Sequence, residues 1–257
     1  MRVAIIGYGA IGSFLVKQLA SDPGLEVTAV FAVPSPPADC KYSVASLDEL
    51  LDTQPEIVVE CAGHEALRMW GPKILCAGKD LLVASVGALA DSEVEVSLRS
   101  AAKSGGKLII PGGALGGIDS LSAAREAGLD FVEYCGRKAP LAWKGTYAES
   151  LIDITNVKSA ITFLECDART AALKFPQNAN VVAAIALAGI GFEKTKVRLM
   201  IDPNVSENHH SYTAIGEFGE LSTCVRSLTL PSNPKTSLLA PFSLIQTIKR
   251  SLGIVLA

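Results

Sequence analysis

The chain has 257 residues, of which 49% are hydrophobic and 19% are charged, and its formal net charge is −3. A chain of this length and composition can bury one large core or two smaller ones, which excludes an intrinsically disordered protein. Its 23 basic and 26 acidic residues form no long run of one sign, so neither a nucleic-acid-binding surface nor a polybasic membrane patch is expected.

The six cysteines and three histidines limit the metal and redox chemistry of the chain. No two cysteines form a CxxC pair, which argues against a zinc ribbon, and their scatter argues against a disulfide framework. With so few ligands, no metal site is expected. No apolar stretch reaches the roughly 20 residues of a membrane span, and the N-terminal apolar run is too short for a signal peptide. We therefore expect a soluble, cytoplasmic protein.

The first part of the sequence alternates short apolar runs with amphipathic segments. We expect strands at residues 2–6, 27–33, 56–61, 80–85 and 107–110, and helices at residues 11–20, 46–51, 64–77 and 92–104. Ser46 is the expected N-cap of the second of these helices. Strict alternation of strand and helix predicts a doubly wound parallel sheet, which is an N-terminal Rossmann domain.

The pattern changes after residue 117, where longer strands follow. We expect strands at residues 131–137, 155–165, 196–202, 209–218 and 220–228, and helices at residues 119–127, 168–175 and 178–188. Asn233 as N-cap and Pro234 as the first helical residue predict a final helix that runs to about residue 251. The fold class is therefore α/β, with a Rossmann domain followed by a second α+β domain on an open, mainly antiparallel sheet.

A glycine motif lies directly after the first expected strand and opens the first expected helix. Residues 7–12 read Gly-Tyr-Gly-Ala-Ile-Gly and match GxGxxG in the context that a dinucleotide site requires. Gly7 permits the tight turn, Gly9 lets a pyrophosphate approach the backbone, and Gly12 lets helix and strand pack closely. The helix N–H groups and dipole then hold the anion. The alternative is a glycine turn that binds no nucleotide.

The acidic residue that usually accompanies this motif is missing from its expected place. An Asp or Glu about 20 residues further on, at the end of the second strand, normally binds the ribose of NAD. Phe31, Ala32 and Val33 occupy that place, and no Arg follows to hold a 2′-phosphate. Ser35 can contribute to either cofactor, so the sequence leaves open the choice between NAD and NADP.

Three further segments have both a structural and a functional interpretation. The glycine-rich loop at residues 111–117 follows the fifth strand, where open α/β sheets bind ligands, and it can equally be a hinge between domains. Asn178 and Asn180 precede an apolar helix, where they either cap it or contact a ligand. The start of the last helix, at residues 233–237, is interpreted as a capped helix end, with capture of a carboxylate as the alternative.

Two adjacent histidines begin one of the later strands. His209 and His210 point to opposite faces of the sheet, so one of them can enter a cleft. A lone histidine is more often structural than catalytic, but an imidazole with a pKa of about 6.5 suits proton transfer at neutral pH. We predict a catalytic histidine in this pair, and we interpret His64 as a packing residue or a neighbour of the cofactor.

Taken together, these motifs resemble the L-aspartate dehydrogenase family over essentially the whole chain. The blocks that carry the resemblance are residues 5–12, 60–65, 85–89, 112–119, 175–181, 202–210 and 233–237. The sequence Arg-Lys-Ala-Pro at residues 137–140 departs mildly from the family pattern, in which a second proline is expected in place of Ala139.

The resemblance implies the domains, the partners and the site residues. Residues 1–115 would form the dinucleotide-binding domain, with a C-terminal helix in residues 233–257 packing back onto it, and residues 116–232 would form the catalytic and dimerisation domain of a homodimer. The family motif selects His210 as the catalytic residue, and Lys235 is a candidate to hold the substrate. The expected contacts to NAD or NADP are Gly7, Gly9, Ala10, Ile11, Gly12, Cys61, Ala62, Ser85, Val86, Ala114 and Asn180.

The implied reaction is the oxidative deamination of L-aspartate to iminoaspartate, which yields oxaloacetate and ammonia or supplies pyridine nucleotide biosynthesis, or the reverse reductive amination. One alternative is a reductase similar to dihydrodipicolinate reductase, in which a Lys and then a Ser-Gly-Thr clamp follow the histidine pair. Here His210 is followed instead by Ser-Tyr-Thr-Ala-Ile-Gly. A second alternative is a sensor that binds NAD(H) without turnover, since a fold alone does not fix a function.

Overall fold

The computed structural model describes residues 1–231, 233–250 and 252. The chain divides into two compact units, one of Met1–Pro111 with Pro241–Ala257 and the other of Gly112–Ala240. The sequence prediction put the corresponding boundaries at residues 115/116 and 232/233. No helix in the described part of the chain is both long and apolar enough to cross a bilayer.

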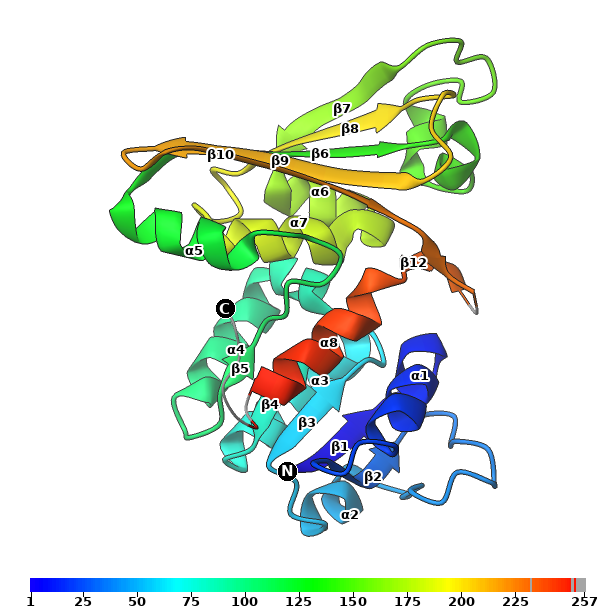
Figure 1. The fold of residues 1–257 in the computed structure, drawn as a ribbon, viewed down its shortest axis with the longest axis vertical. Coiled ribbons are helices and arrows are strands. Elements are labelled where there is room, and N and C mark those ends of the chain that lie inside the picture. Colours follow the sequence, from blue (N-terminus) through cyan, green and yellow to red (C-terminus); the bar gives the residue numbers. More distant parts are fainter. Residues whose placement is uncertain (232, 251, 253–257) are drawn as a thin grey trace. The chain divides into compact units, whose positions relative to one another are not determined.

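The first unit is a Rossmann-like domain, as predicted (Figure 1). Its five-stranded sheet has the order β2-β1-β3-β4-β5, and every pair in it is parallel. The strands are β1 (Arg2–Ile6), β2 (Glu26–Phe31), β3 (Ile57–Glu60), β4 (Asp80–Val83) and β5 (Leu108–Ile109). The α-helices are α1 (Ala10–Leu19), α2 (Leu47–Asp52), α3 (His64–Cys76), α4 (Ser92–Ala102) and α8 (Leu239–Arg250), with a short 3₁₀ helix, η1 (Val86–Ala90).

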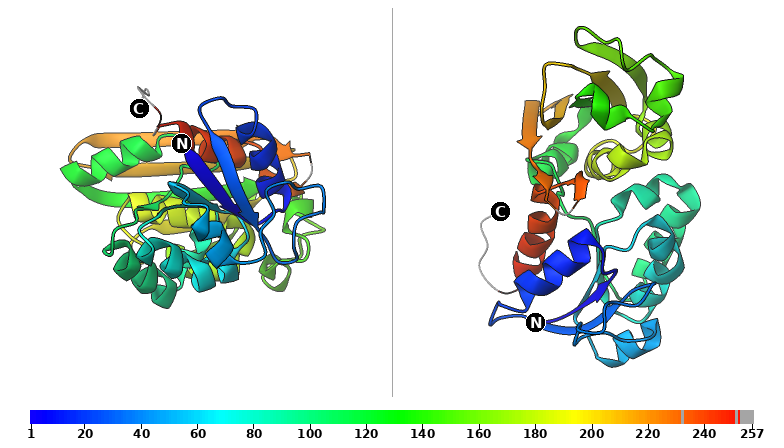
Figure 2. Two further views of the ribbon diagram at one scale, coloured as in Figure 1. Left: turned by 90° about the horizontal axis from the view of Figure 1, so that it is seen from below. Right: turned by 90° about the vertical axis from the view of Figure 1, so that its right-hand side faces the viewer.

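Local sequence chemistry explains several of these elements. Ser46 caps α2 as expected, because its side chain accepts a hydrogen bond from the Glu49 N–H at 3.1 Å. In β1 the four residues after Arg2 are all buried, as expected for a strand between two others and covered on both faces. Helix α8 adds Leu244 and Ile248 to the same core. It lies alongside α1 (Figure 2), where Phe14 and Phe242 meet edge to face at 5.3 Å.

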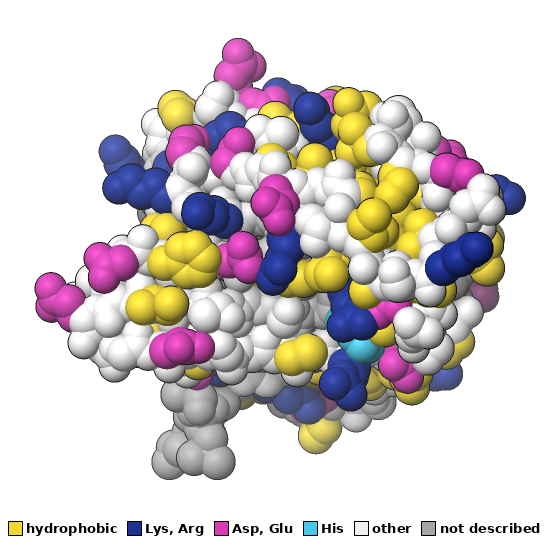
Figure 3. Space-filling model, turned by 90° about the horizontal axis from the view of Figure 1, so that it is seen from above, with side chains coloured by type: hydrophobic (Ala, Val, Ile, Leu, Met, Phe, Trp, Pro, Cys, Tyr) yellow, Lys and Arg dark blue, Asp and Glu magenta, His cyan; other side chains and the backbone are white. Residues whose placement is uncertain are grey.

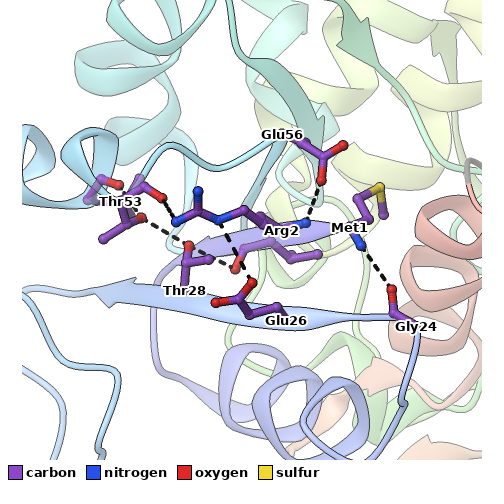
Figure 4. Close-up of polar contacts among 9 residues, drawn as sticks. Met1, Arg2, Gly24, Glu26, Thr28, Thr53 and Glu56 are labelled. Atoms are coloured by element: carbon purple, nitrogen blue, oxygen red, sulfur yellow. Dashed lines mark hydrogen bonds and ion pairs between the residues drawn. The ribbon is translucent and has the colours of Figure 1, made fainter.

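Polar contacts at the start of β1 fix this strand between its neighbours (Figure 4). The backbone N–H of Arg2 donates to Glu56 at 2.7 Å, just before β3, and its guanidinium donates to the Thr53 carbonyl and lies 3.8 Å from Glu26 on β2. The N-terminal amine of Met1 donates to the Gly24 carbonyl at 2.9 Å. These contacts fix one end of β1, so the glycine turn that follows its other end has a defined position.

The second unit is built on one open sheet of order β10-β9-β6-β8-β7. Only β6 and β8 pair in parallel, so the prediction of a mainly antiparallel sheet is confirmed. The strands are β6 (Leu129–Lys138), β7 (Ile161–Asp167), β8 (Lys196–Ile201), β9 (Asn208–Gly216) and β10 (Gly219–Ser227). The helices are α5 (Ile118–Ala127), α6 (Ala168–Lys174), α7 (Pro176–Ala188) and the short η2 (Pro140–Trp143) and η3 (Tyr147–Ser150).

Helices α5, α6 and α7 lie on one face of this sheet (Figure 1). Alternate residues of β6 and β9, such as Val132, Tyr134, Tyr212 and Ala214, are buried against them. On the opposite face, Figure 3 shows basic and acidic side chains beside one another with hydrophobic side chains between them. The alternation along the strands therefore separates a buried face from a mixed surface.

The prediction for the end of the chain is partly wrong. Residues Asn233–Ser237 form a strand, β12, which pairs antiparallel with β11 (Thr229–Leu230), and the last helix begins only at Leu239. Asn233 and Pro234 therefore do not start a helix, because pairing with β11 prevails over the local capping signal. Residues 251 and 253–257 of the predicted segment lie outside the described residues. Strand β7 also begins at Ile161, six residues later than residue 155.

Candidate functional site

The glycine turn after β1 has the geometry that its sequence predicts. Gly7 has a φ of +99°, and a Cβ on it would lie 2.7 Å from the Cys61 carbonyl oxygen. A Cβ on Gly12 would overlap the Gly7 carbonyl group, so this glycine allows α1 to pack against β1. A Cβ on Gly9 would meet no atom within 4 Å, which leaves open space for a ligand beside the backbone.

The first turn of α1, which includes Ala10, Ile11 and Gly12, suits an anion. Gly9 is its N-cap, no side chain caps it, and the first turn has no acidic residue. A cavity of about 520 Å³ lies beside this turn and is lined by Gly7, Gly9, Cys61 and Ala62. Bare helix N–H groups facing a cavity of this size fit the pyrophosphate of a dinucleotide.

The same cavity bears on the choice of cofactor. The segment after β2, residues 32–37, lines it with one Ala, one Val, one Ser and three Pro side chains. Trp70 contributes an aromatic ring whose centre lies 4.8 Å from that of Phe31. Neither a carboxylate nor a cation is among the described residues that line the cavity. Glu26 lies at the other end of β2, beside Arg2. The described lining of this cavity therefore offers no acidic residue that could bind the ribose hydroxyl groups and so favour NAD over NADP.

A buried carboxylate that the sequence analysis missed organises the two neighbouring loops. Glu60, the last residue of β3, is only 1% exposed. Its Oε1 accepts hydrogen bonds from the N–H groups of Ala62 at 2.8 Å and Gly63 at 2.9 Å and from the Ser85 hydroxyl at 2.9 Å, while Oε2 accepts from the Ser85 N–H at 3.1 Å. Four of the predicted cofactor contacts, Cys61, Ala62, Ser85 and Val86, therefore lie in loops that one side chain ties together.

Two predicted cofactor contacts belong to the second unit. Ala114 is buried in the glycine-rich loop, and the end of that loop is held by the Tyr212 hydroxyl, which donates to the carbonyls of Gly116 and Gly117 at 3.1 and 2.7 Å. Asn180 lies on α7 and is exposed. The side chain of Lys235, the candidate for holding the substrate, lies outside the described part of the structure.

The structure separates the two adjacent histidines as the strand period requires. His210 lies on β9 between Gly136 of β6 and Val225 of β10, and it is 4% exposed on the face that the helices cover. His209 faces the other way, with its Nε2 3.7 Å from Glu207. The predicted catalytic ring is therefore turned inward.

The imidazole of His210 does not titrate near neutral pH, contrary to the sequence-based expectation. Burial first, and then the positive charges of Lys138 and His209, lower the pKa of His210 to about 3. The ring is consequently neutral at physiological pH. The low pKa makes the free ring a weak base, and only one of its two nitrogens carries a hydrogen, so the other is a hydrogen-bond acceptor.

Three residues that sequence reasoning did not connect to His210 are joined to it by hydrogen bonds. The Tyr134 hydroxyl lies 2.8 Å from His210 Nδ1, Asn178 Nδ2 donates to the Tyr134 oxygen at 3.0 Å, and Lys138 Nζ donates to Asn178 Oδ1 at 2.8 Å. All four side chains are buried. Asn178 lies inside the first turn of α7, whose N-cap is Phe175, so the capping interpretation of Asn178 is wrong and its amide is part of a buried polar row.

A cavity of about 380 Å³ lies next to this row within the second unit. Lys138, Lys144, Gln177, Asn208 and Ser227 are among the residues that line it. Asn208 precedes His210 by two residues on β9, so the two side chains share a face of the sheet. Two lysines, one carboxylate (Glu207) and several amide or hydroxyl groups line it, so positive charge exceeds negative charge, which suits a small anionic ligand.

Comparison with known proteins agrees with the two-part organisation. Residues 119–251 match the family described as aspartate dehydrogenase, C-terminal, and residues 7–111 match the NAD-binding domain of homoserine dehydrogenase. The chain is 41% identical to the L-aspartate dehydrogenase of Acinetobacter baumannii over 97% of both chains, and 42% identical to that of Ralstonia nicotianae over 96% of both.

Solved structures show the same relationship. The crystal structure of aspartate dehydrogenase from Thermotoga maritima has a TM-score of 0.82 and 25% identity, and the match covers 100% of this chain and 99% of that chain. A dipicolinate-bound dihydrodipicolinate reductase from Paenisporosarcina has a TM-score of 0.51 at 14% identity, covering 97% of this chain and 95% of that chain, which is a likeness of fold.

Proposed function

The chain belongs to the L-aspartate dehydrogenase family, and on that premise we propose that it catalyses the NAD(P)-dependent oxidative deamination of L-aspartate, or the reverse reductive amination. In the deaminating direction a hydride leaves Cα of L-aspartate for C4 of the nicotinamide, which is the chemistry that NAD⁺ or NADP⁺ supplies when bound. The product, iminoaspartate, adds water to give oxaloacetate and ammonia.

His210 is the proposed catalytic residue. The substrate amine must be neutral before the hydride leaves, because an ammonium nitrogen has no lone pair with which to form the imine. His210 takes that proton, activates the water that hydrolyses the imine, or does both in turn. The observation that supports this role most directly is that a buried, neutral imidazole is joined through Tyr134 and Asn178 to Lys138, which lines a cavity.

The cavity beside Asn208 is the proposed place for the substrate. Its volume of about 380 Å³ accommodates a four-carbon diacid, and Lys138 and Lys144 offer charge to the carboxylates. The cofactor is proposed to bind through the glycine turn of the first unit, and Ala114 and Asn180 remain predicted cofactor contacts.

The alternatives have weaker support. A sensor without turnover does not require a buried histidine that is joined through a tyrosine and an asparagine to a lysine. A dihydrodipicolinate reductase would need the Lys and Ser-Gly-Thr residues that do not follow His210 in this sequence.

A spectrophotometric assay at 340 nm tests the proposal, with L-aspartate plus NAD⁺ or NADP⁺ and with oxaloacetate, ammonia and the reduced cofactors. We expect His210→Ala to lower kcat by about 10²–10⁴, the usual contribution of a positioned acid or base. His209→Ala is the matched control, since its side chain lies on the other face of the same strand, and it should keep near-wild-type kcat. A near-wild-type kcat in His210→Ala, with intact folding, would exclude His210 as the catalytic group.

We further propose that the protein is a homodimer that works in the cytoplasm and supplies iminoaspartate to pyridine nucleotide biosynthesis. The six cysteines are all free, which suits a reducing compartment. The sheet face opposite α5, α6 and α7 carries partly buried ion pairs such as Arg198–Glu133 at 3.0 Å and is the surface that a second copy would cover. Light scattering should give twice the chain mass of 26.9 kDa, and a monomer would contradict the dimer.

A further inference from the structure

The row of buried side chains that ends at His210 contains several consecutive hydrogen bonds. Three contacts of 2.8, 3.0 and 2.8 Å join Lys138, Asn178, Tyr134 and His210 in that order. The Lys138 ammonium also lies 5.0 Å from the centre of the Trp143 ring. Such a buried row is stable only when each donor meets an acceptor, so its members constrain one another.

We propose that Lys138, Asn178 and Tyr134 are positioning residues, and that this row decides which ring nitrogen of His210 carries the proton. For its catalytic consequence the inference rests on the proposed role of His210. The row itself is a property of the folded second unit, so it can be tested without turnover.

The donor groups of Lys138 determine the direction of every hydrogen bond in the row. A charged lysine has three N–H donors and no acceptor, so it must face the amide oxygen of Asn178. The amide nitrogen of Asn178 then donates to the Tyr134 oxygen, and the Tyr134 proton is directed at Nδ1 of His210. With Nδ1 accepting, the single proton of the neutral ring lies on Nε2, so Nε2 presents a hydrogen-bond donor.

A neutral Lys138 permits the opposite direction. An uncharged amine can accept a hydrogen bond from the Asn178 amide nitrogen, after which the amide oxygen accepts from Tyr134 and Tyr134 accepts from Nδ1–H of His210. Nε2 is then the unprotonated nitrogen that can take a proton from the substrate amine. The reversal requires the Asn178 amide to turn over, and the ring to release its Nε2 proton to solvent while Nδ1 takes one up. Loss of one proton at Lys138 thus allows Nε2 to become an acceptor, while His210 itself remains neutral.

The surroundings of Lys138 make this change accessible. Burial lowers the pKa of Lys138 to about 8, whereas burial raises the pKa of Tyr134 above its usual value, so the tyrosine keeps its proton. The other titratable or charged groups nearby include Lys144 and Glu207, which line the same cavity as Lys138, and His209 beside His210. The Arg137–Asp202 ion pair is also close, since the Asp202 N–H donates to the Lys138 carbonyl at 2.9 Å. Of the side chains in the row, Lys138 is therefore the one that loses a proton near pH 8.

Long-range ¹⁵N–¹H NMR of the imidazole rings tests the proposal, because the chain has three histidines and the shifts of Nδ1 and Nε2 distinguish the tautomers. In the wild-type protein we expect the Nε2–H tautomer of His210 below about pH 8 and a growing Nδ1–H population above it. Lys138→Arg keeps a donor-only cation at every accessible pH and should hold the Nε2–H tautomer throughout. Lys138→Met removes the cation and should abolish the change with pH.

Three further variants separate positioning from general disturbance. Tyr134→Phe breaks the row and should lower kcat at least about tenfold with little change in the KM for L-aspartate. Thr170→Val, which removes a 2.8 Å hydroxyl hydrogen bond to Asp167 elsewhere in the same unit, is the matched control and should keep the wild-type tautomer. Lys144→Met tests whether any lysine at the cavity has the same effect, and it should keep the wild-type change with pH.

A wild-type His210 whose tautomer is constant from pH 6 to 10 would overturn the proposal, as would an identical pH response in Lys138→Arg. If Lys138 has a purely structural role, one of these two results is expected. If the protein shows the tautomer change but does not oxidise L-aspartate, the proposed function fails while this inference stands.

Discussion

Replacement of Glu60 by alanine tests how the edge of the first sheet is organised. The carboxylate of Glu60 is the acceptor for three backbone N–H groups and one hydroxyl in the loops after β3 and β4. Without it, the N–H groups of Ala62, Gly63 and Ser85 lose their partner, and that of Ser85 loses it in a buried position. Both loops carry predicted cofactor contacts, so the substitution should weaken stability and cofactor binding together.

The expected magnitude follows from the hydrogen bonds. Four bonds at a net value of about 1 kcal/mol each give a loss of about 3–5 kcal/mol in the free energy of unfolding. For a unit of this size, each kcal/mol lowers Tm by roughly 3–5 °C, so a fall of about 10 °C or more is expected. Loosened loops should raise the Kd for the dinucleotide by at least about tenfold, which corresponds to about 1.4 kcal/mol.

The isosteric variant Glu60→Gln separates charge from geometry. Burial raises the pKa of Glu60 above its usual value, although its hydrogen bonds act in the opposite direction. A raised pKa in the folded state means that this contribution to stability is complete below the unfolded pKa of about 4.3 and is lost as the pH rises through the folded pKa. The wild-type free energy of unfolding should therefore fall across that window, and the fall should be smaller in Glu60→Gln.

Denaturant unfolding and a fluorescence titration with NAD⁺ and NADP⁺ measure these effects. Glu56→Ala is the matched control, because Glu56 lies just before the same strand, is exposed, and accepts one hydrogen bond from the Arg2 N–H. We expect it to cost about 1 kcal/mol or less. If Glu60→Ala unfolds at the same denaturant concentration as Glu56→Ala and binds the cofactor normally, the organising role of Glu60 is refuted.

Three other substitutions have definite expected outcomes. Gly7→Ala forces a side chain into a φ of +99° and against the Cys61 carbonyl oxygen, so the Kd for the cofactor should rise at least about tenfold in the same titration; unchanged binding would contradict the turn geometry. Gly136→Ala places a Cβ 2.7 Å from the Tyr134 hydroxyl oxygen, so kcat should fall while the Kd for the cofactor stays constant, and a normal kcat would count against the polar row. Leu244→Ala opens a cavity where α8 packs and should cost about 2–5 kcal/mol in unfolding experiments, whereas a loss below 1 kcal/mol would show that α8 is dispensable to that core.

The features that the sequence predicted correctly depend on interactions between near neighbours. The buried run of residues 2–6, the glycine turn that follows it and the Ser46 cap each involve residues within a few positions of one another. Their chemistry is local, so the sequence pattern reports it directly. The same reasoning failed at Asn233, where a good helix-capping signal gave way to a strand that pairs with β11, a few residues earlier in the chain. Two local signals competed there, and the capping pattern reported only one of them.

Only the tertiary structure shows which residues surround His210, the proposed catalytic residue. The sequence alone indicated His210 as one of two adjacent histidines, and the strand period showed that the two rings face opposite ways. Tyr134 is 76 residues from His210 and Asn178 is 40 residues from Lys138, so no spacing in the sequence marks them as partners. Pairing of β6 with β9 and packing of α7 on the sheet bring them into contact, and the burial that results removes the charge from the imidazole. Local interactions determine most of the helices and strands, so the sequence alone predicts them. Hydrogen bonding and desolvation between distant segments determine the protonation state of His210, so only the tertiary structure shows it.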